Sequence, residues 1–197
     1  MDVLTLLKKD HKDVGKLLDD ALQCDPGDDK LYDLASRIEK ALTVHATIEE
    51  KFFYPLLRQR AEEQEDTVDV FEAYTEHDLL KRLISLLQSG RQPDEQFKAE
   101  VQVLGESVKH HVKEEESTIF SLAQKYMDKS ELDEMGEKME KTKRRLMAQK
   151  TATLASPSVA SNDAAREKTP ARKTPAQKTP ARKAPARKAS ARKAIHR

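Results

Sequence analysis

The sequence predicts an all-α protein built around a four-helix bundle. Helix-forming residues dominate the composition, aromatic residues make up 5%, and only 5 of the 197 residues are glycine. Apolar residues return every three or four positions in four long segments, which is the spacing of one face of an α-helix. Each segment also has one histidine on its apolar face, so the four faces are expected to meet at a common centre.

A turn rich in aspartate, proline and glycine separates the first two predicted helices. The first helix covers about residues 2–24, and the turn covers residues 25–28, because proline and glycine are the strongest local helix breakers. Asp28 or Asp29 is expected to cap the second helix. Pro55 lies in the last part of this helix and should bend it, because proline cannot donate a backbone hydrogen bond.

The third and fourth predicted helices follow two further breaks. An acidic, polar stretch at residues 61–67 indicates the second turn. The apolar residues of the third helix fall within 70–87, and the segment 89–93 ends it with a glycine and a proline. The fourth helix has its apolar residues within 97–122. Together the four helices predict an up-down-up-down bundle.

A fifth, highly charged helix and a basic tail are expected after the bundle. The helix should cover about residues 131–149, with Ser130 and Asp133 as a cap pair, and should dock weakly. From residue 151 large apolar residues almost vanish, so this segment cannot offset the entropy of ordering and is predicted to be disordered. The sequence thus divides into a bundle at 1–127, an accessory helix at 128–150 and a tail at 151–197.

The net charge of +1 hides two parts of opposite charge. Residues 1–150 hold 24 Lys and Arg against 33 Asp and Glu, a net charge of −9. Residues 151–197 hold 12 against 2, a net charge of +10, which indicates two tasks or two partners. The single cysteine, Cys24, excludes an intrachain disulfide, and no signal peptide or membrane-spanning run is recognisable. We therefore expect a cytoplasmic protein with no membrane partner, associated with the nucleoid through its tail.

Five-residue repeats place pairs of cations along the tail. The first four copies have proline at the third position, which blocks a stable helix and favours extended polyproline II. In composition the tail resembles those of linker histones and histone-like bacterial proteins, and it suits binding to duplex phosphates without base readout. A tail bound to an acidic protein surface, or one without a partner, is the alternative. The expected nucleic-acid-binding residues are Lys168, Arg172, Lys173, Lys178, Arg182, Lys183, Arg187, Lys188, Arg192 and Lys193.

Six residues on the apolar faces of the four helices form a candidate metal site. Two histidines stand alone, and two are followed four residues later by a glutamate. Residues i and i+4 lie one turn apart on one helix face, so each pair can direct an imidazole and a carboxylate at one point. A carboxylate on a core face is unfavourable unless it is paired, protonated or metal-bound. The candidate ligands are His11, His45, Glu49, His77, His111 and Glu115.

Helical phase separates these ligands from neighbouring polar residues. His110 lies about 100° round the helix from His111, so it is expected to be exposed or to lie behind the ligands. Glu50, Glu114 and Glu116 are off-phase in the same way. Histidines that merely pack in the core are the alternative interpretation. Four imidazoles and two carboxylates exceed the needs of one tetrahedral zinc ion and suit two bridged metal ions. Iron is favoured, with manganese or zinc as alternatives.

Residues 1 to about 125 resemble the hemerythrin-like, or HHE cation-binding, family. The resemblance is carried by the order H…HxxxE…H…HxxxE and by the phrases HATIEEKFFYPLL at 45–57, EHDLLKRLI at 76–84 and HHVKEEESTIF at 110–120. It implies a four-helix bundle with a non-haem centre of two iron ions. The four histidines would then ligate as imidazoles, with Glu49 and Glu115 as bridging carboxylates.

Two positions depart from the pattern of the oxygen-carrying members of that family. Those proteins have a second histidine on the third helix, one turn before the matching one, and this chain has Ala73 there. Its fourth helix also has Glu115 at i+4 from the histidine in place of an aspartate at i+5. One metal should therefore keep an exchangeable position or recruit Tyr74 or another nearby group. Otherwise Tyr54 and Tyr74 are expected to be packing residues.

These observations predict a di-iron protein that senses or handles O2, peroxide or iron and is held on nucleic acid by its tail. An open metal position suits sensing or redox chemistry better than reversible oxygen carriage. A peroxidase-like di-iron enzyme associated with DNA, and a structural nucleoid protein with a stabilising metal site, are the alternatives. No catalytic residue and no organic cofactor is assigned, and the sequence does not decide whether the protein is an enzyme.

Overall fold

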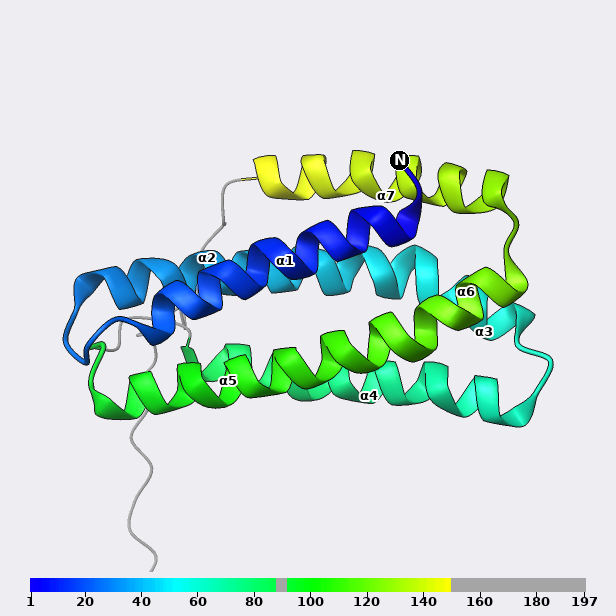
Figure 1. Cartoon of the computed structure of the whole chain (residues 1–197). Coiled ribbons are helices and arrows are strands. Elements are labelled where there is room, and N and C mark those ends of the chain that lie inside the picture. The colour runs from blue at the N-terminus through cyan, green and yellow to red at the C-terminus, as the bar shows by residue number, and fades with distance from the viewer. Residues whose placement is uncertain (88–91, 150–197) are drawn as a thin grey trace, which may run out of the picture. The chain divides into compact units, whose positions relative to one another are not determined.

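The protein is helical, as its sequence predicts. The computed structural model describes residues 1–87 and 92–149. Within these ranges there are helices and no strands: four helical rods form a bundle, and a fifth helix lies along one side of it (Figure 1). The all-α bundle with an additional helix is therefore confirmed. None of the described helices is long and apolar enough to cross a membrane. The predicted tail, with its ten candidate nucleic-acid contacts, lies outside the described residues.

Two of the four rods are single helices and two are built from three segments. The single helices are α1 (Val3–Leu22) and α4 (Gln64–Leu87). The second rod consists of α2 (Asp29–Ile48), η1 (Glu49–Phe53) and α3 (Tyr54–Arg60). The fourth rod consists of α5 (Glu95–Glu114), η2 (Glu115–Ile119) and α6 (Phe120–Tyr126).

Aspartate side chains cap the N-termini of several helices. Asp2, Asp28 and Asp94 accept hydrogen bonds from backbone N–H groups of α1, α2 and α5 at 2.9, 2.8 and 2.8 Å. This satisfies donors that have no partner within the helix itself. Asp128 caps the fifth helix in a capping box with Glu131. The predicted cap pair of Ser130 and Asp133 was therefore wrong.

The second turn lies within residues 61–67, as the sequence predicts. The preceding helix α3 ends at Arg60, and α4 begins at Gln64. Glu65 and Asp66 lie in the first turn of α4, where carboxylates interact favourably with the helix dipole. Asp66 also accepts a hydrogen bond from Tyr126 Oη of α6 at 2.5 Å.

Two π-helical turns interrupt the second and fourth rods at matching places. η1 begins at Glu49 and η2 begins at Glu115, the glutamates of the two His-x-x-x-Glu pairs. In η1 the backbone N–H of Tyr54 donates to the carbonyl of Glu49, five residues earlier. In η2 the backbone N–H of Phe120 donates to the carbonyl of Glu115 in the same way. Pro55 follows η1, but α6 contains no proline, so proline is not the common cause. Turns of this kind frequently occur at functional sites.

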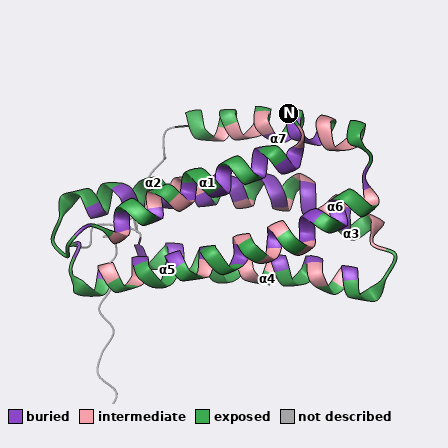
Figure 2. Ribbon diagram, viewed as in Figure 1, coloured by how far each residue is buried: buried purple, intermediate pink, exposed green. Residues whose placement is uncertain are grey.

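The candidate ligands lie in a polar layer between two apolar clusters of the bundle. Each of the four candidate histidines is preceded by a residue of one cluster and followed by a residue of the other. For example, Leu7 and Val14 lie one turn on either side of His11. Figure 2 shows buried residues along the inner faces of the rods. Because both clusters exclude water, charges in the layer interact in a medium of low polarity.

The fifth helix, α7 (Lys129–Ala148), packs against α1 and α2 (Figure 1). Its contact surface contains Met139, which is completely buried, and Met135. Gly136 lies so close to the N-terminal backbone that a Cβ atom there would be 2.8 Å from Val3 N. The absent side chain thus allows a close approach. The buried residues of α7 are Met135, Gly136 and Met139, so the helix docks through one part of its surface, and the strength of this docking stays a prediction.

Candidate metal centre

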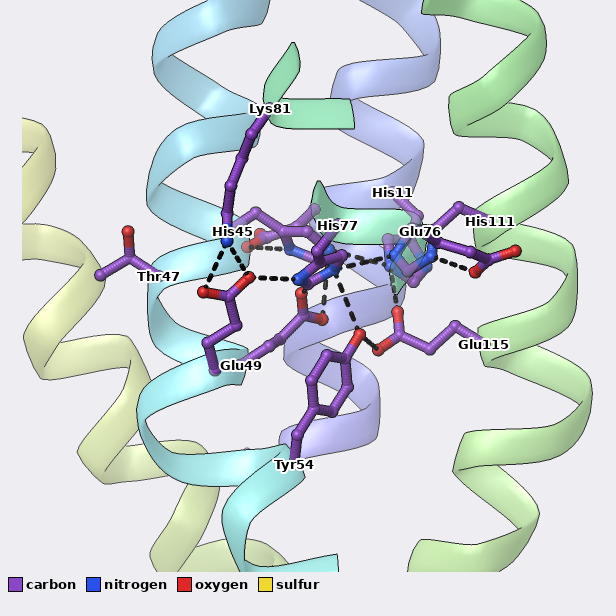
Figure 3. A network of polar contacts seen from close by, with 12 residues as sticks. His11, His45, Thr47, Glu49, Tyr54, Glu76, His77, Lys81, His111 and Glu115 are labelled. Atoms are coloured by element: carbon purple, nitrogen blue, oxygen red, sulfur yellow. Dashed lines mark hydrogen bonds and ion pairs between the residues drawn. The ribbon is translucent and has the colours of Figure 1, made fainter. Parts of the chain in front are cut away.

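All six candidate ligands come together in the middle of the bundle (Figure 3). They lie on α1, α2, η1, α4, α5 and η2, and all six are buried. The exposed fraction is 0% for Glu49 and 1% for Glu115. Two carboxylates withdrawn so far from water require a strong compensating interaction.

The six residues form two groups that share Glu49. The groups are His11, His45, Glu49 and Glu115, and Glu49, His77 and His111. The Nε2 atoms are 3.2 Å apart in the pair His11 and His45, and 3.1 Å apart in the pair His77 and His111. Glu49 Oε1 is 3.2 Å from His45 Nε2, and its Oε2 is 3.4 Å from His77 Nε2. One carboxylate therefore faces both histidine pairs.

Buried polar atoms without a hydrogen bond are concentrated in this layer. Among the described residues these atoms are both carboxylate oxygens of Glu49, Oε2 of Glu115, Nδ1 of His45 and Oδ2 of Asp10. Leaving one buried polar group unsatisfied costs about 1–3 kcal/mol. A set of imidazole nitrogens and carboxylate oxygens is one that iron, manganese and zinc accept. The residues present thus fit metal ions, which would satisfy the ligating atoms of both glutamates.

The two glutamates differ in their protonation. Burial and the negative charge of Glu115 raise the pKa of Glu49 well above its usual range. Burial would also raise the pKa of Glu115, but the close contact with His11 Nε2 at 3.0 Å and the other nearby imidazoles outweigh burial and lower it. Burial lowers the pKa of His45 to about 4. His45 is therefore neutral at pH 7 and has a lone pair with which to bind a metal ion.

A second carboxylate stands behind each histidine and comes from a neighbouring rod. The pairs, measured from histidine Nδ1 to the carboxylate oxygen, are Glu116 with His11 at 2.8 Å, Asp10 with His45 at 3.6 Å, Glu50 with His77 at 2.9 Å and Glu76 with His111 at 2.8 Å. The four pairs form a closed ring around the bundle. The histidine of α2 contacts a carboxylate from α1, and the histidine of α4 contacts one from η1. The histidine of α5 contacts a carboxylate from α4, and the histidine of α1 contacts one from η2. Such carboxylates orient the imidazoles and direct Nε2 towards a metal.

Reasoning from helical phase set Glu50 and Glu116 apart from the ligands but did not predict which histidine each contacts, and it did not single out Asp10 and Glu76. Glu50 and Glu116 are off-phase for direct ligation, yet each contacts a ligand on another rod. A sequence signal did exist, because each outer carboxylate directly adjoins a candidate ligand: Asp10 before His11, Glu50 after Glu49, Glu76 before His77 and Glu116 after Glu115. His110 is exposed, as expected, with Nε2 at 3.2 Å from Glu76 Oε1.

The layer holds more carboxylates than lysine side chains. The inner pair and the outer ring provide six carboxylates. Two lysines neutralise part of this charge: Lys81 pairs with Glu50 at 2.7 Å, and Lys143 of α7 pairs with Asp10. The carboxylates outnumber these lysines, and such a surplus of acidic groups suits the binding of cations.

Tyr54 reaches this centre from α3. Its side chain is completely buried, and its Oη donates to Glu115 Oε1 at 2.9 Å and lies 3.2 Å from His77 Nε2. Burial raises the pKa of Tyr54 well above its usual range, so the phenol is protonated. Tyr54 packs in an apolar cluster, as expected, and in addition contacts two of the candidate ligands. Tyr74 packs against it, with ring centroids 5.2 Å apart, and Ala73 lies in the same apolar cluster.

A small cavity lies beside both groups and opens between α2 and α4. Its volume is about 130 Å³, and it contacts all four ligating histidines. Its walls are mainly apolar, and the exposed residues Thr43, Thr47 and Lys81 line it on the solvent side. Since the share of one water in liquid volume is about 30 Å³, the cavity admits a few waters or a molecule of a few atoms.

Comparison with known families agrees with this geometry. The family model "Hemerythrin HHE cation binding domain" matches residues 2–123, a segment that contains all six candidate ligands. The chain belongs to the hemerythrin HHE family. It is similar to a hemerythrin HHE cation binding domain-containing protein from Mycobacterium kansasii, with a TM-score of 0.64 and 21% identity over 74% of this chain and 87% of that chain. This likeness supports the hemerythrin-like fold.

A curated relative of this HHE protein is a "DNA nickase" from Nostoc sp.. The two are 33% identical over 122 residues, or 61% of this chain. The matched region spans 33% of the length of that relative. As a family member this chain has a cation-binding domain, and its clusters of histidine and glutamate are suited to hold metal ions.

Proposed function

We propose that this HHE protein binds two iron ions and uses them to sense or handle O2, peroxide or iron. The observation that carries this proposal is that Glu49 faces two histidine pairs beside one small cavity. The proposed ligands are His11, His45, His77, His111 and the bridging residues Glu49 and Glu115. Tyr54 would complete the group that has fewer ligands.

The residues around the two metal positions divide the site into two sides. Tyr54 belongs to one apolar cluster, whereas the cavity walls, such as Leu80 and Ile84, belong to the other. A small ligand would therefore arrive on the side opposite the phenol. When bound, the iron pair supplies electron transfer and an exchangeable position for such a ligand. The outer carboxylates hold the imidazoles in place, and the apolar walls admit small ligands better than charged ones.

Metal analysis with matched histidine variants tests the metal centre. We expect about two iron ions per chain in the wild type, from the donor count. His111→Ala should lose metal, because His111 lies in the second group. His110→Ala is the matched control on the same helix and should keep both ions, since His110 is exposed. A wild type that retains one metal ion, or equal loss in both variants, would contradict the proposal.

Tyr54→Phe tests whether the phenol takes the place of the missing imidazole. The variant keeps the aromatic ring in the apolar cluster and loses only the hydroxyl that contacts Glu115 and His77. Both ions should remain, and the visible absorption of the oxidised protein should change because one donor is lost. An unchanged spectrum would restrict Tyr54 to hydrogen bonding.

A peroxidase-like enzyme is the second candidate function, and the cavity that contacts all four histidines favours it. Peroxide consumption over many turnovers would support catalysis. A single oxidation event followed by a lasting spectral change would support sensing. A stable and fully reversible oxygenated spectrum would contradict both and indicate oxygen carriage.

We also propose that residues 151–197 bind nucleic acid and associate the protein with the nucleoid. Their net charge of +10 and their paired cations support this, and one relative is named a DNA nickase. About eight to ten phosphate contacts would make affinity fall steeply with salt. Gel shifts across a salt series, with and without residues 151–197, test the proposal. Equal binding by both forms would refute it.

A further inference from the structure

Helix α4 has a second apolar face that points away from its own bundle. Its inner face contains buried residues such as Val70 and Leu80. On its outer side large apolar residues remain in water: the exposed fraction is 54% for Val68, 50% for Phe71, 54% for Leu79 and 46% for Leu86. Exposed apolar residues that follow one helix face mark an interaction surface.

The spacing on this outer face is that of a coiled-coil seam. The positions follow one another at alternating intervals of four and three residues, which keeps them in line along one stripe of the helix. We call them the α4 seam: Val68, Glu72, Thr75, Leu79, Arg82 and Leu86. All six are exposed. The stripe extends over about 27 Å at 1.5 Å per residue.

The α4 seam is symmetric about its middle. Val68 and Leu86 are equally distant from His77 in sequence, and so are Glu72 and Arg82, and Thr75 and Leu79. If two α4 helices met antiparallel about a twofold axis at this point, each residue would face its counterpart on the other chain. Apolar residues would then face apolar residues or Thr75, and each glutamate would face an arginine.

The two charged residues of the seam, Glu72 and Arg82, could form ion pairs between two chains but do not form one within a single chain. Glu72 and Arg82 are ten residues apart on one helix, too far for a contact along it. Within residues 1–87 and 92–149, no ion pair involves the side chain of either. The twofold arrangement would form this ion pair twice.

Two acidic residues flank the position of the twofold axis, and each has a polar partner within its own chain. Asp78 lies 3.4 Å from Lys81 Nζ, and Glu76 lies 2.8 Å from His111 Nδ1. Both carboxylates are thus held by contacts within their own chain.

We propose that the α4 seam binds a second copy of this chain, forming an antiparallel twofold dimer. The interface would be smaller than the roughly 800 Å² per partner of a standard protein interface, because one helix from each chain provides most of it. The dimer should therefore be reversible, with a dissociation constant in the micromolar range, at about −8 kcal/mol.

Charge reversal tests this register with variants that control for one another. Glu72→Arg and Arg82→Glu would each place like charges opposite one another, twice per dimer. Sedimentation velocity of the full chain should show each variant dimerising about tenfold more weakly than the wild type, which corresponds to about 1.4 kcal/mol. Lys16→Glu reverses an exposed charge on α1 and should leave the dimer unchanged.

Mixing the two weakened variants is the decisive measurement. In a mixed dimer every arginine faces a glutamate again, so an equimolar mixture should recover the affinity of the wild type. A misfolded variant would not be rescued by mixing. A wild type that stays monomeric up to about 100 µM, or a mixture that dimerises no better than either variant alone, would overturn the proposal. A wild-type dimer insensitive to both reversals would place the interface elsewhere and overturn it as well.

Discussion

The substitution Glu49→Gln should stabilise the metal-free protein, although it removes a proposed metal ligand. Glu49 is 0% exposed, and neither of its oxygens accepts a hydrogen bond. Its raised pKa means that folding must protonate it or bury its charge. Glutamine has the same shape and no charge. It therefore removes the free-energy cost of protonating or burying this carboxylate on folding, which should be about 1–3 kcal/mol. For a domain of this size the unfolding midpoint should rise by roughly 2–12 °C.

Glutamine at position 115 should have the opposite effect. Glu115 accepts a hydrogen bond from Tyr54 and lies 3.0 Å from His11 Nε2. Its lowered pKa means that the ionised form is favoured in the folded state. Removing hydrogen bonds to a charged group should destabilise the metal-free protein by about 1.5–3 kcal/mol.

The two glutamates should also respond oppositely to pH. Because the pKa of Glu49 is raised on folding, its unfavourable contribution grows as the pH rises above about 4.3 towards its folded pKa. The favourable contribution of Glu115 is present above about 4.3 and is lost as the pH falls through its lowered pKa. Glu49→Gln should therefore flatten the loss of stability with rising pH.

Chemical unfolding of the metal-free proteins at pH 7, followed by circular dichroism, is the assay. Adding iron(II) at 100 times its dissociation constant should stabilise the wild type by about 2.7 kcal/mol. Both variants should lose most of this gain. If the two substitutions shifted the metal-free stability in the same direction, the opposite protonation of Glu49 and Glu115 would be refuted.

Three further predictions concern the contacts of α7. Lys143→Met should destabilise the protein by about 1.5–3 kcal/mol, because Asp10 is 4% exposed and loses its partner; urea unfolding measures this, with an exposed lysine of α7 as control. Gly136→Leu should detach α7, because even a Cβ would lie 2.8 Å from the N-terminal backbone; unchanged amide exchange in α7 would contradict this. Arg60 lowers the pKa of Glu131 to about 2, so Glu131→Gln should destabilise at pH 7, and the difference should vanish near pH 2.

The sequence was sufficient to predict the helices and the six inner residues, because both depend on local periodicity. An apolar residue every three or four positions defines one helix face, whatever that face later contacts. Phase along that face separated His111 from His110, which the structure shows to be exposed. It likewise selected Glu115 from its neighbours, and Glu115 is the one that forms a group with His11, His45 and Glu49.

The outer carboxylates, Tyr54 and the docking of α7 could not be predicted in the same way, because each depends on which rods are neighbours. Glu50 is off-phase on its own rod, yet it contacts His77 because α4 lies beside η1. The sequence around Tyr54 indicates only a packing residue, because its hydrogen-bond partner Glu115 lies on the fourth rod, 61 positions away in the sequence. In the sequence, Gly136 is a residue of low helix propensity in a charged helix. Only the structure shows that the N-terminal backbone packs against it. The periodicity along each helix therefore specifies the candidate ligands, whereas the residues that contact and orient them are brought to them only when the rods pack together.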